Sequence, residues 1–481
     1  MESIQEDKKR MINMSGSNVN WLPHLTNEMI PNEVHGINLS VYSIALEGWR
    51  RGLKLKFFPK LHEDKYEIQF SLSNENRKHI FTVTKGDKVQ DSAVLLCNDK
   101  TKCKEVLQKA GLLVPIGKNF KKGSNIEKII SFANDIGYPV ILKTNISMSK
   151  KINSNVIKTE KELIETLSNE KINSDILVEK YITGENYRIY VLDGQIISVI
   201  KKIPAKVIGD GKHTIKELIE IKNLQRKNNP YLQTKPIKID EEIINNLHKK
   251  DYTLNTILKS EEKLYLKSNC HISSGGDTIN FTNNFPDSLK KLVLKAVDAI
   301  PGLYQCSVDV IVDNDNNGYV LEIDTQACIA SHIFPVEGNA IDVPKAIIDY
   351  YFPETKNNER LNLYFDFSKI INILRRGLLK EMVVSNQIQT TNMKKQYYEA
   401  YGDVNTNKFH NWLLKYTLNL NLNGFAKSLE NGVKCIVIYG EANNVDKFHK
   451  LLEKNVPLMV NTTYDNEYLS LPIKVGFEII D

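Results

Sequence analysis

The chain has 481 residues, 41% of them hydrophobic and 25% charged, a composition typical of a folded globular protein that is long enough for several domains. The net charge of +6 comes from 64 basic and 58 acidic residues without a long basic block, which favours an anionic small molecule over nucleic acid as the ligand. The six cysteines form no CxxC pair, which argues against a zinc site or a disulfide framework.

The N-terminal part is predicted to be a disordered tail followed by a small α/β domain. Residues 1–18 are polar without an apolar signal core, and no run in the chain reaches the length of a membrane span. We therefore expect a cytoplasmic protein without a membrane partner. Residues 19–98 combine a helix, VYSIALEGWRRG, with alternating strands such as YEIQFSLS and KHIFTVT. Trp49, Arg50 and Arg51 are interpreted as packing and surface residues.

The next part of the chain combines a helix with two apolar strands that end in charged residues. Residues 99–115 predict a helix that ends at a glycine and is followed by a proline. The strand GYPVILKT carries Lys143 at its end, and the strand ILVEKYITGENYRIYVL carries Glu179, Glu185 and Arg188. Such a strand end offers backbone groups to a purine, a carboxylate to a ribose and a cation to phosphates.

The middle of the chain carries a polar stretch and a glycine-containing turn. Residues 228–262 are rich in Lys and Asn and are expected to be a mobile insertion. The turn that follows allows two interpretations, a close backbone approach to a substrate with hydroxyl donors or a plain turn, and both stay open. Its residues are Ser273, Ser274, Gly275 and Gly276.

Residues 308–324, VDVIVDNDNNGYVLEID, are predicted to form a β-hairpin with three carboxylates on one face. A register that pairs Val312 with Tyr319 would set Asp309 opposite Glu322, and Asp324 shares the face of Glu322. Like charges opposite each other destabilise a sheet unless they are neutralised. One or two hard divalent cations with oxygen ligands are therefore the expected occupants.

Two other interpretations of this hairpin place no metal site on its sheet face. Its turn, with Asp313, Asp315 and Asn317, nearly matches a calcium-binding EF-hand loop, but an EF-hand requires helices on both sides, whereas both flanks here predict strands. The second is a solvated hairpin face with acids near an exposed turn, which the residues alone leave open.

Residues 354–394 are expected to be a linker to a C-terminal domain, residues 395–481. The order β-α-β-β-α-β in that domain predicts a ferredoxin-like sandwich. It resembles acylphosphatase in this order and in the stretch LNGFAKSLENGVKCIVIYG. The resemblance places His410 where acylphosphatases carry Arg, and Lys427 or Ser428 where they carry Asn. It therefore implies a binding or docking module without hydrolase activity.

Residues 99–353 resemble the ATP-grasp superfamily, and most closely the carboxylate-amine ligase domains of cyanophycin synthetases and bifunctional glutathione synthetases. The similar blocks are IPAKVIGDGKHTIKELIEIKN, SSGGDTINFTNNF and the hairpin with EIDTQACIASHIFPVEG. The resemblance implies an α+β fold class, an ATP-grasp fold with two α+β lobes that grip ATP. It also implies Mg²⁺ as the cofactor ion, with Mn²⁺ as a substitute.

The same resemblance assigns roles to individual residues. The nucleotide positions, from the phosphate lysines through the adenine strand to the ribose carboxylate, are Lys104, Lys143, Glu179, Lys180, Tyr181, Ile182 and Glu185. The catalytic positions that face the transferred phosphoryl group are Arg188 and Lys202. The metal positions are Asp309, Glu322 and Asp324, the acids of the predicted hairpin.

The loop after Lys143, NISMSKKINSN, lacks the glycines of the family's phosphate flap, so either Ser147, Ser149 and Lys150 replace the backbone contacts or ATP handling is impaired. The resemblance implies a ligase that joins a carboxylate to an amine through an acyl phosphate, on an amino acid or small peptide. A pseudo-enzyme that binds nucleotide or peptide is the alternative, and a C-terminal acyl-phosphate hydrolase is a third hypothesis. The substrates and the oligomeric state stay open, with a homodimer as one option.

Overall fold

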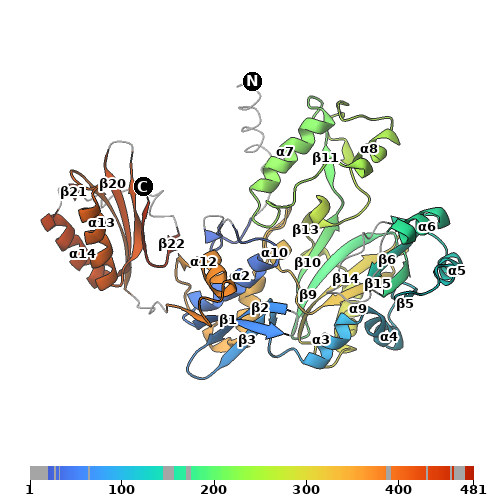
Figure 1. Cartoon of the computed structure of the whole chain (residues 1–481), viewed down its shortest axis with the longest axis horizontal. Coiled ribbons are helices and arrows are strands. Elements are labelled where there is room, and N and C mark those ends of the chain that lie inside the picture. Colours follow the sequence, from blue (N-terminus) through green and yellow to red (C-terminus); the bar gives the residue numbers. More distant parts are fainter. Residues whose placement is uncertain are drawn as a thin grey trace. The chain divides into compact units, whose positions relative to one another are not determined.

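The computed structural model describes the following ranges: 20–26, 29–31, 33–62, 65–144, 156–169, 175–385, 392–429, 432–455, 458–459 and 472–480. The chain divides into two compact units (Figure 1). The first consists of Met1–Leu22, His35–Ser40 and Phe81–Tyr350, and the second of Pro23–Val34, Val41–Ile80 and Tyr351–Asp481. The predicted disordered tail and the glycine-free loop after Lys143 lie outside the described residues.

The largest sheet of the first unit has five antiparallel strands in the order β13-β10-β9-β14-β15. They are β9 (Glu185–Leu192), β10 (Gln195–Ile203), β13 (Asp277–Asn280), β14 (Gln305–Val312) and β15 (Gly318–Asp324). Because side chains alternate between the faces of a strand, Ile189, Val308 and Val310 point into one core with helix α9 (Asp287–Asp298). The opposite face carries the charged side chains of the candidate site.

A four-stranded sheet of the first unit has the order β5-β8-β6-β7. Its strands are β5 (Gly117–Phe120), β6 (Val140–Thr144), β7 (Val156–Ile157) and β8 (Ile176–Lys180), and its helices are α5 (Ile126–Ile136) and α6 (Glu160–Asn169). Val140, Leu142 and Val178 pack with these helices into a separate core. The preceding helices α3 (Asp91–Asn98) and α4 (Lys100–Lys109) pack instead into the core of the larger sheet.

Residues 228–262, expected to be a mobile insertion, belong to a third core of the first unit. Strands β11 (Lys206–Ile208) and β12 (Lys263–Tyr265) pair, and helices α7 (Ile215–Lys227) and α8 (Glu241–His248) accompany them. Ile243, Leu247 and Leu258 are buried in this core. The apolar residues are sparse in a polar sequence, yet several of them reach the interior, whereas Ile239 and Ile257 are exposed. Further short elements are β4 (Lys85–Gly86), η2 (Ile272–Ser274), η3 (Thr282–Asn284), α10 (Ala330–Ile333) and α11 (Val343–Tyr351).

The N-terminal part of the second unit is a helix on a sheet, but it also includes the segment expected to be a linker. The elements are α2 (Ile37–Arg50), β1 (Lys54–His62), β2 (Lys65–Ser73), β3 (Lys78–Thr82), η4 (Pro353–Thr355), β16 (Leu363–Tyr364), α12 (Phe367–Arg375) and β17 (Met382–Val384). Strand β17 pairs with β1, so that Val384 lies opposite Leu55. Residues 354–394 are thus partly folded, because buried residues such as Leu363 and Phe365 need a core.

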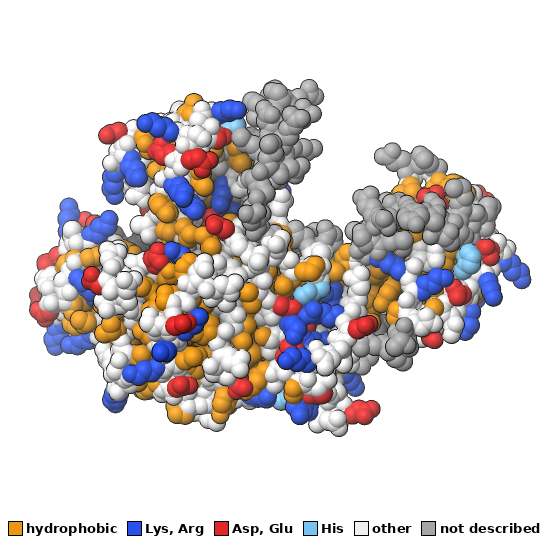
Figure 2. Space-filling model, turned by 180° about the vertical axis from the view of Figure 1, so that it is seen from behind, with side chains coloured by type: hydrophobic (Ala, Val, Ile, Leu, Met, Phe, Trp, Pro, Cys, Tyr) orange, Lys and Arg blue, Asp and Glu red, His pale blue; other side chains and the backbone are white. Residues whose placement is uncertain are grey.

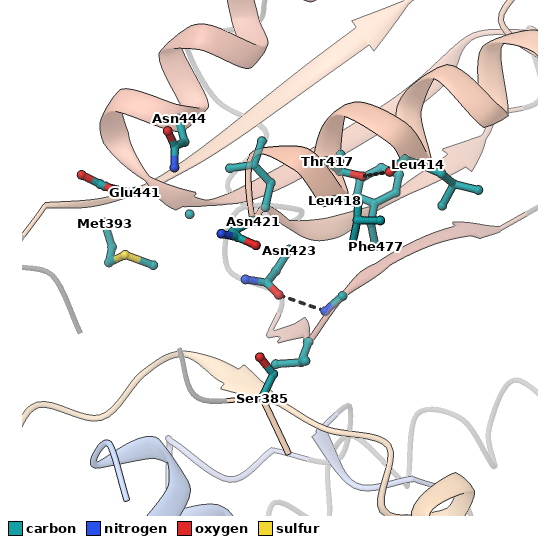
Figure 3. A pocket seen from close by; sticks show the side chains of 14 residues that line it. Ser385, Met393, Leu414, Thr417, Leu418, Asn421, Asn423, Glu441, Asn444 and Phe477 are labelled. Carbon is teal, nitrogen blue, oxygen red and sulfur yellow. Dashed lines mark hydrogen bonds between the residues drawn. The ribbon is translucent and has the colours of Figure 1, made fainter. Parts of the chain in front are cut away.

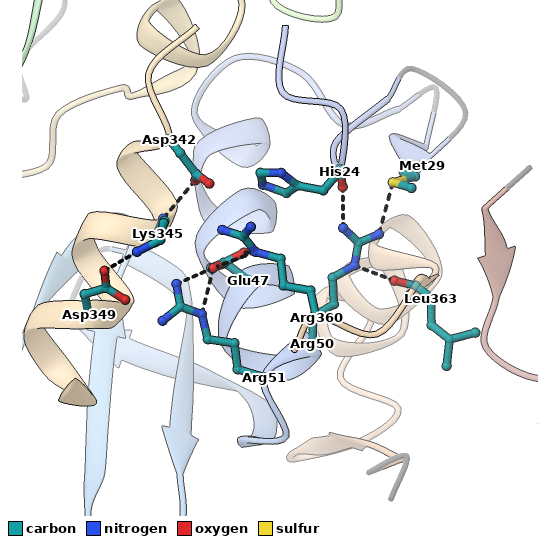
Figure 4. A network of polar contacts seen from close by, with 10 residues as sticks. All are labelled: His24, Met29, Glu47, Arg50, Arg51, Asp342, Lys345, Asp349, Arg360 and Leu363. Carbon is teal, nitrogen blue, oxygen red and sulfur yellow. Dashed lines mark hydrogen bonds and ion pairs between the residues drawn. The ribbon is translucent and has the colours of Figure 1, made fainter. Parts of the chain in front are cut away.

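Buried arginines of this unit hold segments together instead of facing a ligand (Figure 4). The Nε atom of Arg50 donates to the carbonyl oxygen of Leu363 at 2.6 Å, and its Nη1 atom donates to the carbonyl oxygen of His24 at 2.5 Å. Glu47 accepts from Arg51 Nε at 2.7 Å and from Arg360 Nε at 2.8 Å. The interpretation of Arg50 and Arg51 as packing residues is confirmed.

The C-terminal domain has the predicted β-α-β-β-α-β order. Its elements are β18 (Met393–Ala400), α13 (Asn407–Asn419), β19 (Asn423–Ser428), β20 (Lys434–Glu441), α14 (Ala442–Asn455), β21 (Leu458–Met459), β22 (Ile473–Lys474) and β23 (Phe477–Ile480). The sheet order is β21-β18-β20-β19-β23, and one core joins Leu413 of α13 and Phe448 of α14 to Ile436 of β20. Among the described helices of the whole chain, none has the length and apolar character that a bilayer crossing requires.

Candidate functional site

A cavity of about 710 Å³ in the first unit gathers most of the residues singled out from the sequence. Those that line it are Lys143, Glu179, Lys180, Tyr181, Ile182, Glu185, Arg188, Lys202, Asp309 and Glu322. Lys104 and Asp324 do not line the cavity. Lys104 contacts the lining residue Glu179, and Asp324 lies two residues after the lining residue Glu322 on β15. Acidic and basic side chains are interspersed over most of the face shown in Figure 2. Because the cavity gathers the residues singled out from the sequence, it is the candidate site.

The β14–β15 hairpin sets two acids opposite each other, as predicted, but by a different register. Asp309 lies opposite Glu322, whereas Val312 pairs with Gly318 and Ile311 pairs with Tyr319, so the predicted pairing of Val312 with Tyr319 is wrong. A β-bulge between Asp309 and Val310 leaves Leu321 as the extra residue on β15 and restores the opposition of the two acids. Without this bulge Asp309 would face an apolar residue.

The turn of this hairpin is not an EF-hand. Both flanks are strands, and the turn is closed by Asp313, whose Oδ1 atom accepts from the backbone N–H groups of Asp315 and Asn317 at 2.9 and 2.8 Å. These bonds are those of an ordinary Asx turn. The calcium interpretation is therefore excluded.

Asp309 is the centre of a buried charge cluster on the sheet face. Arg188 lies directly opposite it on β9 and donates from Nε and Nη2 to Asp309 Oδ1 and Oδ2 at 2.8 and 2.9 Å. Lys202 on β10 donates from Nζ to Oδ2 at 2.7 Å. Burial by itself would raise the pKa of Asp309, but Arg188 and Lys202 outweigh it and hold that pKa well below its usual value. The carboxylate is thus ionised and both cations are held in place.

The donor set of the hairpin suits Mg²⁺ by the type of its ligands. Asp309, Glu322 and Asp324 supply carboxylate oxygens on one sheet face, and oxygen ligands are those that hard divalent cations prefer. In this structure Glu322 lies 3.3 Å from Lys100 Nζ, and Asp324 accepts from the backbone of Gln326 at 2.8 Å. Across the described ranges, no group of three or more His, Cys, Asp and Glu side chains is close enough to hold a metal ion.

Two lysines predicted to contact phosphates meet at one buried carboxylate. Glu179 on β8 is fully buried, and its Oε2 atom lies 2.8 Å from Lys143 Nζ of β6, while its Oε1 atom contacts Lys104 Nζ of α4. Burial, and next the charge of Lys100, lowers the pKa of Lys143 to about 8. Burial, and next the charge of Lys143, lowers the pKa of Lys104 well below its usual value.

The segment after Glu179 is fixed by its backbone. The Lys180 N–H donates to the carbonyl oxygen of Ile116 at 2.8 Å, and the Tyr181 N–H donates to that of Pro139 at 3.0 Å. The Lys180 ammonium donates to the carbonyl oxygen of Gly137 at 2.9 Å. Glu185, at the predicted ribose position, accepts from Lys201 Nζ. This bond, and next a bond from the Tyr187 hydroxyl, lowers the pKa of Glu185.

The serine and glycine residues assigned to substrate, Ser273, Ser274, Gly275 and Gly276, are not among the residues that line the cavity. The Ser274 hydroxyl donates within its own turn, to Asn269 Oδ1 at 2.9 Å. Gly275 has a φ of +101°, and a Cβ atom there would lie 2.6 Å from the side chain of Ile237. These contacts favour the plain-turn interpretation.

The structure adds residues to the cavity that carried no signal in the sequence. Tyr265 ends β12, and Lys267, Cys270 and His271 follow it; all four line the cavity with the predicted residues. No motif marks them, because they reach the cavity only through the pairing of β11 with β12.

His332 was also not foreseen. It lies fully buried on α10, with its Nδ1 atom 2.8 Å from the Ser198 hydroxyl oxygen, and its Nε2 atom has no hydrogen-bond partner among the described residues. Burial, and next the charge of Arg188, lowers the pKa of His332 to about 3. The ring is therefore neutral near pH 7.

The low pKa of His332 predicts an acid-sensitive fold. Between about pH 3 and 6.5 the unfolded chain binds a proton that the folded chain excludes, so the free energy of unfolding decreases as the pH falls, by up to about 1.4 kcal/mol per unit. His332→Gln removes this titration. Urea unfolding at pH 7, 6 and 5 should show a shallower pH dependence for the variant. Parallel profiles of the two proteins would contradict the assignment.

In the C-terminal domain, two residues at positions assigned by the acylphosphatase resemblance, His410 and Ser428, each contact another side chain. His410 Nε2 lies 2.8 Å from Lys434 Nζ, and the Ser428 hydroxyl donates to Asn405 Oδ1 at 3.0 Å. A separate cavity of about 600 Å³ in the same unit contains none of these residues (Figure 3). It is lined by apolar side chains and by asparagines, of which Asn423 accepts from the Gly476 N–H at 2.9 Å.

Two family models match parts of the chain. A RimK-like ATP-grasp domain matches residues 97–210, and acylphosphatase matches residues 396–479. The first match runs from α3 through the four-stranded sheet to the end of β11, and the second covers the C-terminal sandwich. The resemblances to ATP-grasp ligases and to acylphosphatase, and the α+β fold class, are confirmed.

Curated relatives extend the similarity. The chain is 28% identical over 333 residues to the glutathione biosynthesis bifunctional protein GshAB of Clostridium perfringens, which covers 66% of this chain and 41% of that protein. It is 30% identical over 275 residues to the cyanophycin synthetase of Crocosphaera subtropica. This match covers 54% of this chain and 31% of that protein. The chain thus spans less than half the length of these relatives. A solved bifunctional glutathione synthetase from Pasteurella multocida is 24% identical, covers 62% of this chain and 42% of that chain, and has a TM-score of 0.46.

Proposed function

We propose that the chain is an ATP- and Mg²⁺-dependent ligase that joins a carboxylate to an amine through an acyl phosphate. The observation that supports this most strongly is that Lys143, Arg188 and Lys202 line one cavity together with two acids of the β14–β15 hairpin, Asp309 and Glu322. A triphosphate needs cations along its length, and a transferred phosphoryl group needs cations that face its developing charge. The similarity of residues 97–210 to an ATP-grasp domain supports the same activity.

The proposed reaction has two steps. A carboxylate oxygen of the substrate attacks the γ-phosphorus of ATP, the bond to the bridging oxygen breaks, and ADP leaves. The amine then attacks the acyl carbon, and the departing phosphate takes the proton of the amine. Arg188 and Lys202 lie on neighbouring strands and meet at Asp309, so they would face the same phosphoryl group. Because positioning and charge carry the chemistry, no side-chain nucleophile is required.

Asp309, Glu322 and Asp324 are the residues that would hold Mg²⁺, or Mn²⁺ in its place. The ion, when bound, supplies neutralisation of the phosphate oxygens. In this structure Asp309 contacts Arg188 and Lys202, and Glu322 contacts Lys100, so a bound ion would share these carboxylates with the cations.

The proposed substrates are an amino acid or a small peptide. The names of the relatives, a glutathione biosynthesis protein and a cyanophycin synthetase, support this class. For the C-terminal domain we propose a binding role without hydrolysis, because His410 stands where the acylphosphatase resemblance implies Arg. The cytoplasmic location, and the homodimer as one option for assembly, stay predictions.

Release of ADP tests the proposed activity. Purified chain with Mg²⁺ and ATP should release ADP over many turnovers only with a pool that supplies both a carboxylate and an amine, such as amino acids, and mass spectrometry should find an amide product. Binding of ATP without turnover in any pool would favour a nucleotide-binding pseudo-enzyme. Hydrolysis of acetyl phosphate by the same chain would favour the C-terminal hydrolase.

A further inference from the structure

We propose that Glu179 is a positioning residue for the two phosphate-binding lysines and that its side chain does not bind the purine. Its carboxylate contacts Lys104 with one oxygen and lies 2.8 Å from Lys143 with the other. Both oxygens are thus committed to ammonium groups. The inference rests on the proposed nucleotide binding. Glu179 stays on the strand assigned to adenine, but its side chain positions the lysines.

The strand register explains why the two groups meet. Lys143 lies opposite Leu177 in the pairing of β6 with β8, and Glu179 is two residues further along β8 on the same face. Diagonal neighbours of this kind are within reach of long side chains. Lys104 joins them from α4, where it is only 8% exposed.

Gly117 provides the space that this carboxylate occupies. It lies opposite Glu179 in the pairing of β5 with β8, and a Cβ atom at Gly117 would lie 2.9 Å from Glu179 Cγ. That distance is shorter than carbon atoms tolerate, so any larger residue would displace Glu179. The fold thus leaves room for this one side chain at full burial.

Charge supplies the physical reason for the arrangement. Two ammonium groups held close together repel each other, and Lys143 accordingly lowers the pKa of Lys104. A buried carboxylate that contacts both ammonium groups offsets this repulsion. Phosphate oxygens at the cavity would then meet a fixed pair of cations, of which Lys143 lines the wall.

Binding of three probes to the full chain separates the two roles of Glu179. The probes are ATP with Mg²⁺, adenosine, and inorganic tripolyphosphate, each measured by calorimetry. For Glu179→Gln we expect affinity for ATP and for tripolyphosphate to fall about tenfold or more, which is about 1.4 kcal/mol, with adenosine changed by less than about twofold. Glu185→Gln is the matched control, because the same chemical change at the predicted ribose position should weaken adenosine and spare tripolyphosphate.

A variant without the lysines keeps the proposal testable if Glu179→Gln alone does not fold. The double variant Lys104→Met, Lys143→Met removes both cations, and adding Glu179→Gln to it removes the remaining buried charge. If Glu179 acts through the lysines, this addition should not change the affinity for ATP. A further loss of ATP affinity would overturn the proposal.

The outcomes also separate this proposal from the ligase activity. Weaker adenosine binding by Glu179→Gln, with tripolyphosphate unchanged, would overturn the role of Glu179 and leave the ligase activity intact. Tighter binding of tripolyphosphate would overturn it as well, since Glu179 would then compete with phosphate. Wild-type chain that binds ATP and tripolyphosphate without turnover would contradict only the ligase activity.

Discussion

Asp309→Asn should lower the free energy of unfolding by about 3–5 kcal/mol and abolish ADP release. The change removes the charge that Arg188 and Lys202 share, and it leaves two largely buried cations without their partner. It also removes one of the three proposed metal ligands. Urea unfolding and the ADP assay measure the two effects independently.

Asp315→Asn is the matched control for this experiment. Asp315 lies in the exposed turn of the same hairpin, so the same chemical change there should alter stability by less than about 0.5 kcal/mol and leave turnover intact. If Asp309→Asn were as stable as this control, the charge cluster would not contribute to the fold as described.

Glu322→Gln should reduce turnover by about 100-fold or more while the chain stays folded. The Glu322 side chain is 37% exposed and its ion pair with Lys100 is 3.3 Å long, so its charge adds little to stability. Its proposed work is to hold the ion that neutralises ATP phosphates, and glutamine keeps the shape without the charge. Steady-state ADP release and thermal unfolding would be compared with those of the wild type.

Glu105→Gln is the control for this second substitution, because Glu105 is exposed on α4 and does not line the cavity. It should leave turnover unchanged. Full activity of Glu322→Gln alongside this control would remove Glu322 from the proposed metal site.

The acids of the site could be predicted from the sequence, whereas their partners could not. Alternation along a strand is a local property, so it placed Asp309 and Glu322 on one face. The β-bulge between Asp309 and Val310 was not foreseen, because no residue in the hairpin marks the inserted position. The bond from Arg188 to Asp309 depends on the pairing of β9 with β14, which is a long-range choice of the fold.

The same distinction explains the errors about organisation. Residues 354–394 looked like a linker, since nothing local indicates that β17 will pair with β1 more than 300 residues earlier. Residues 228–262 looked mobile because their apolar residues are sparse, and only the packed core shows that several of them, such as Ile243 and Leu258, are buried together. Local patterns predicted the element order of the C-terminal domain, because each helix and strand carries its own periodicity, whereas the sheet order, in which β18 pairs with β20, is not a local property.

Transfer of carboxylate oxygen to phosphate tests the central claim most directly. In the proposed reaction the bond between the acyl carbon and a carboxylate oxygen breaks in the second step, so that oxygen leaves with the phosphate. With substrate pools labelled with ¹⁸O in their carboxylates, we predict ¹⁸O in the released inorganic phosphate in proportion to the ADP formed. Phosphate without ¹⁸O, released together with ADP, would contradict an acyl-phosphate ligase and indicate hydrolysis of ATP by water.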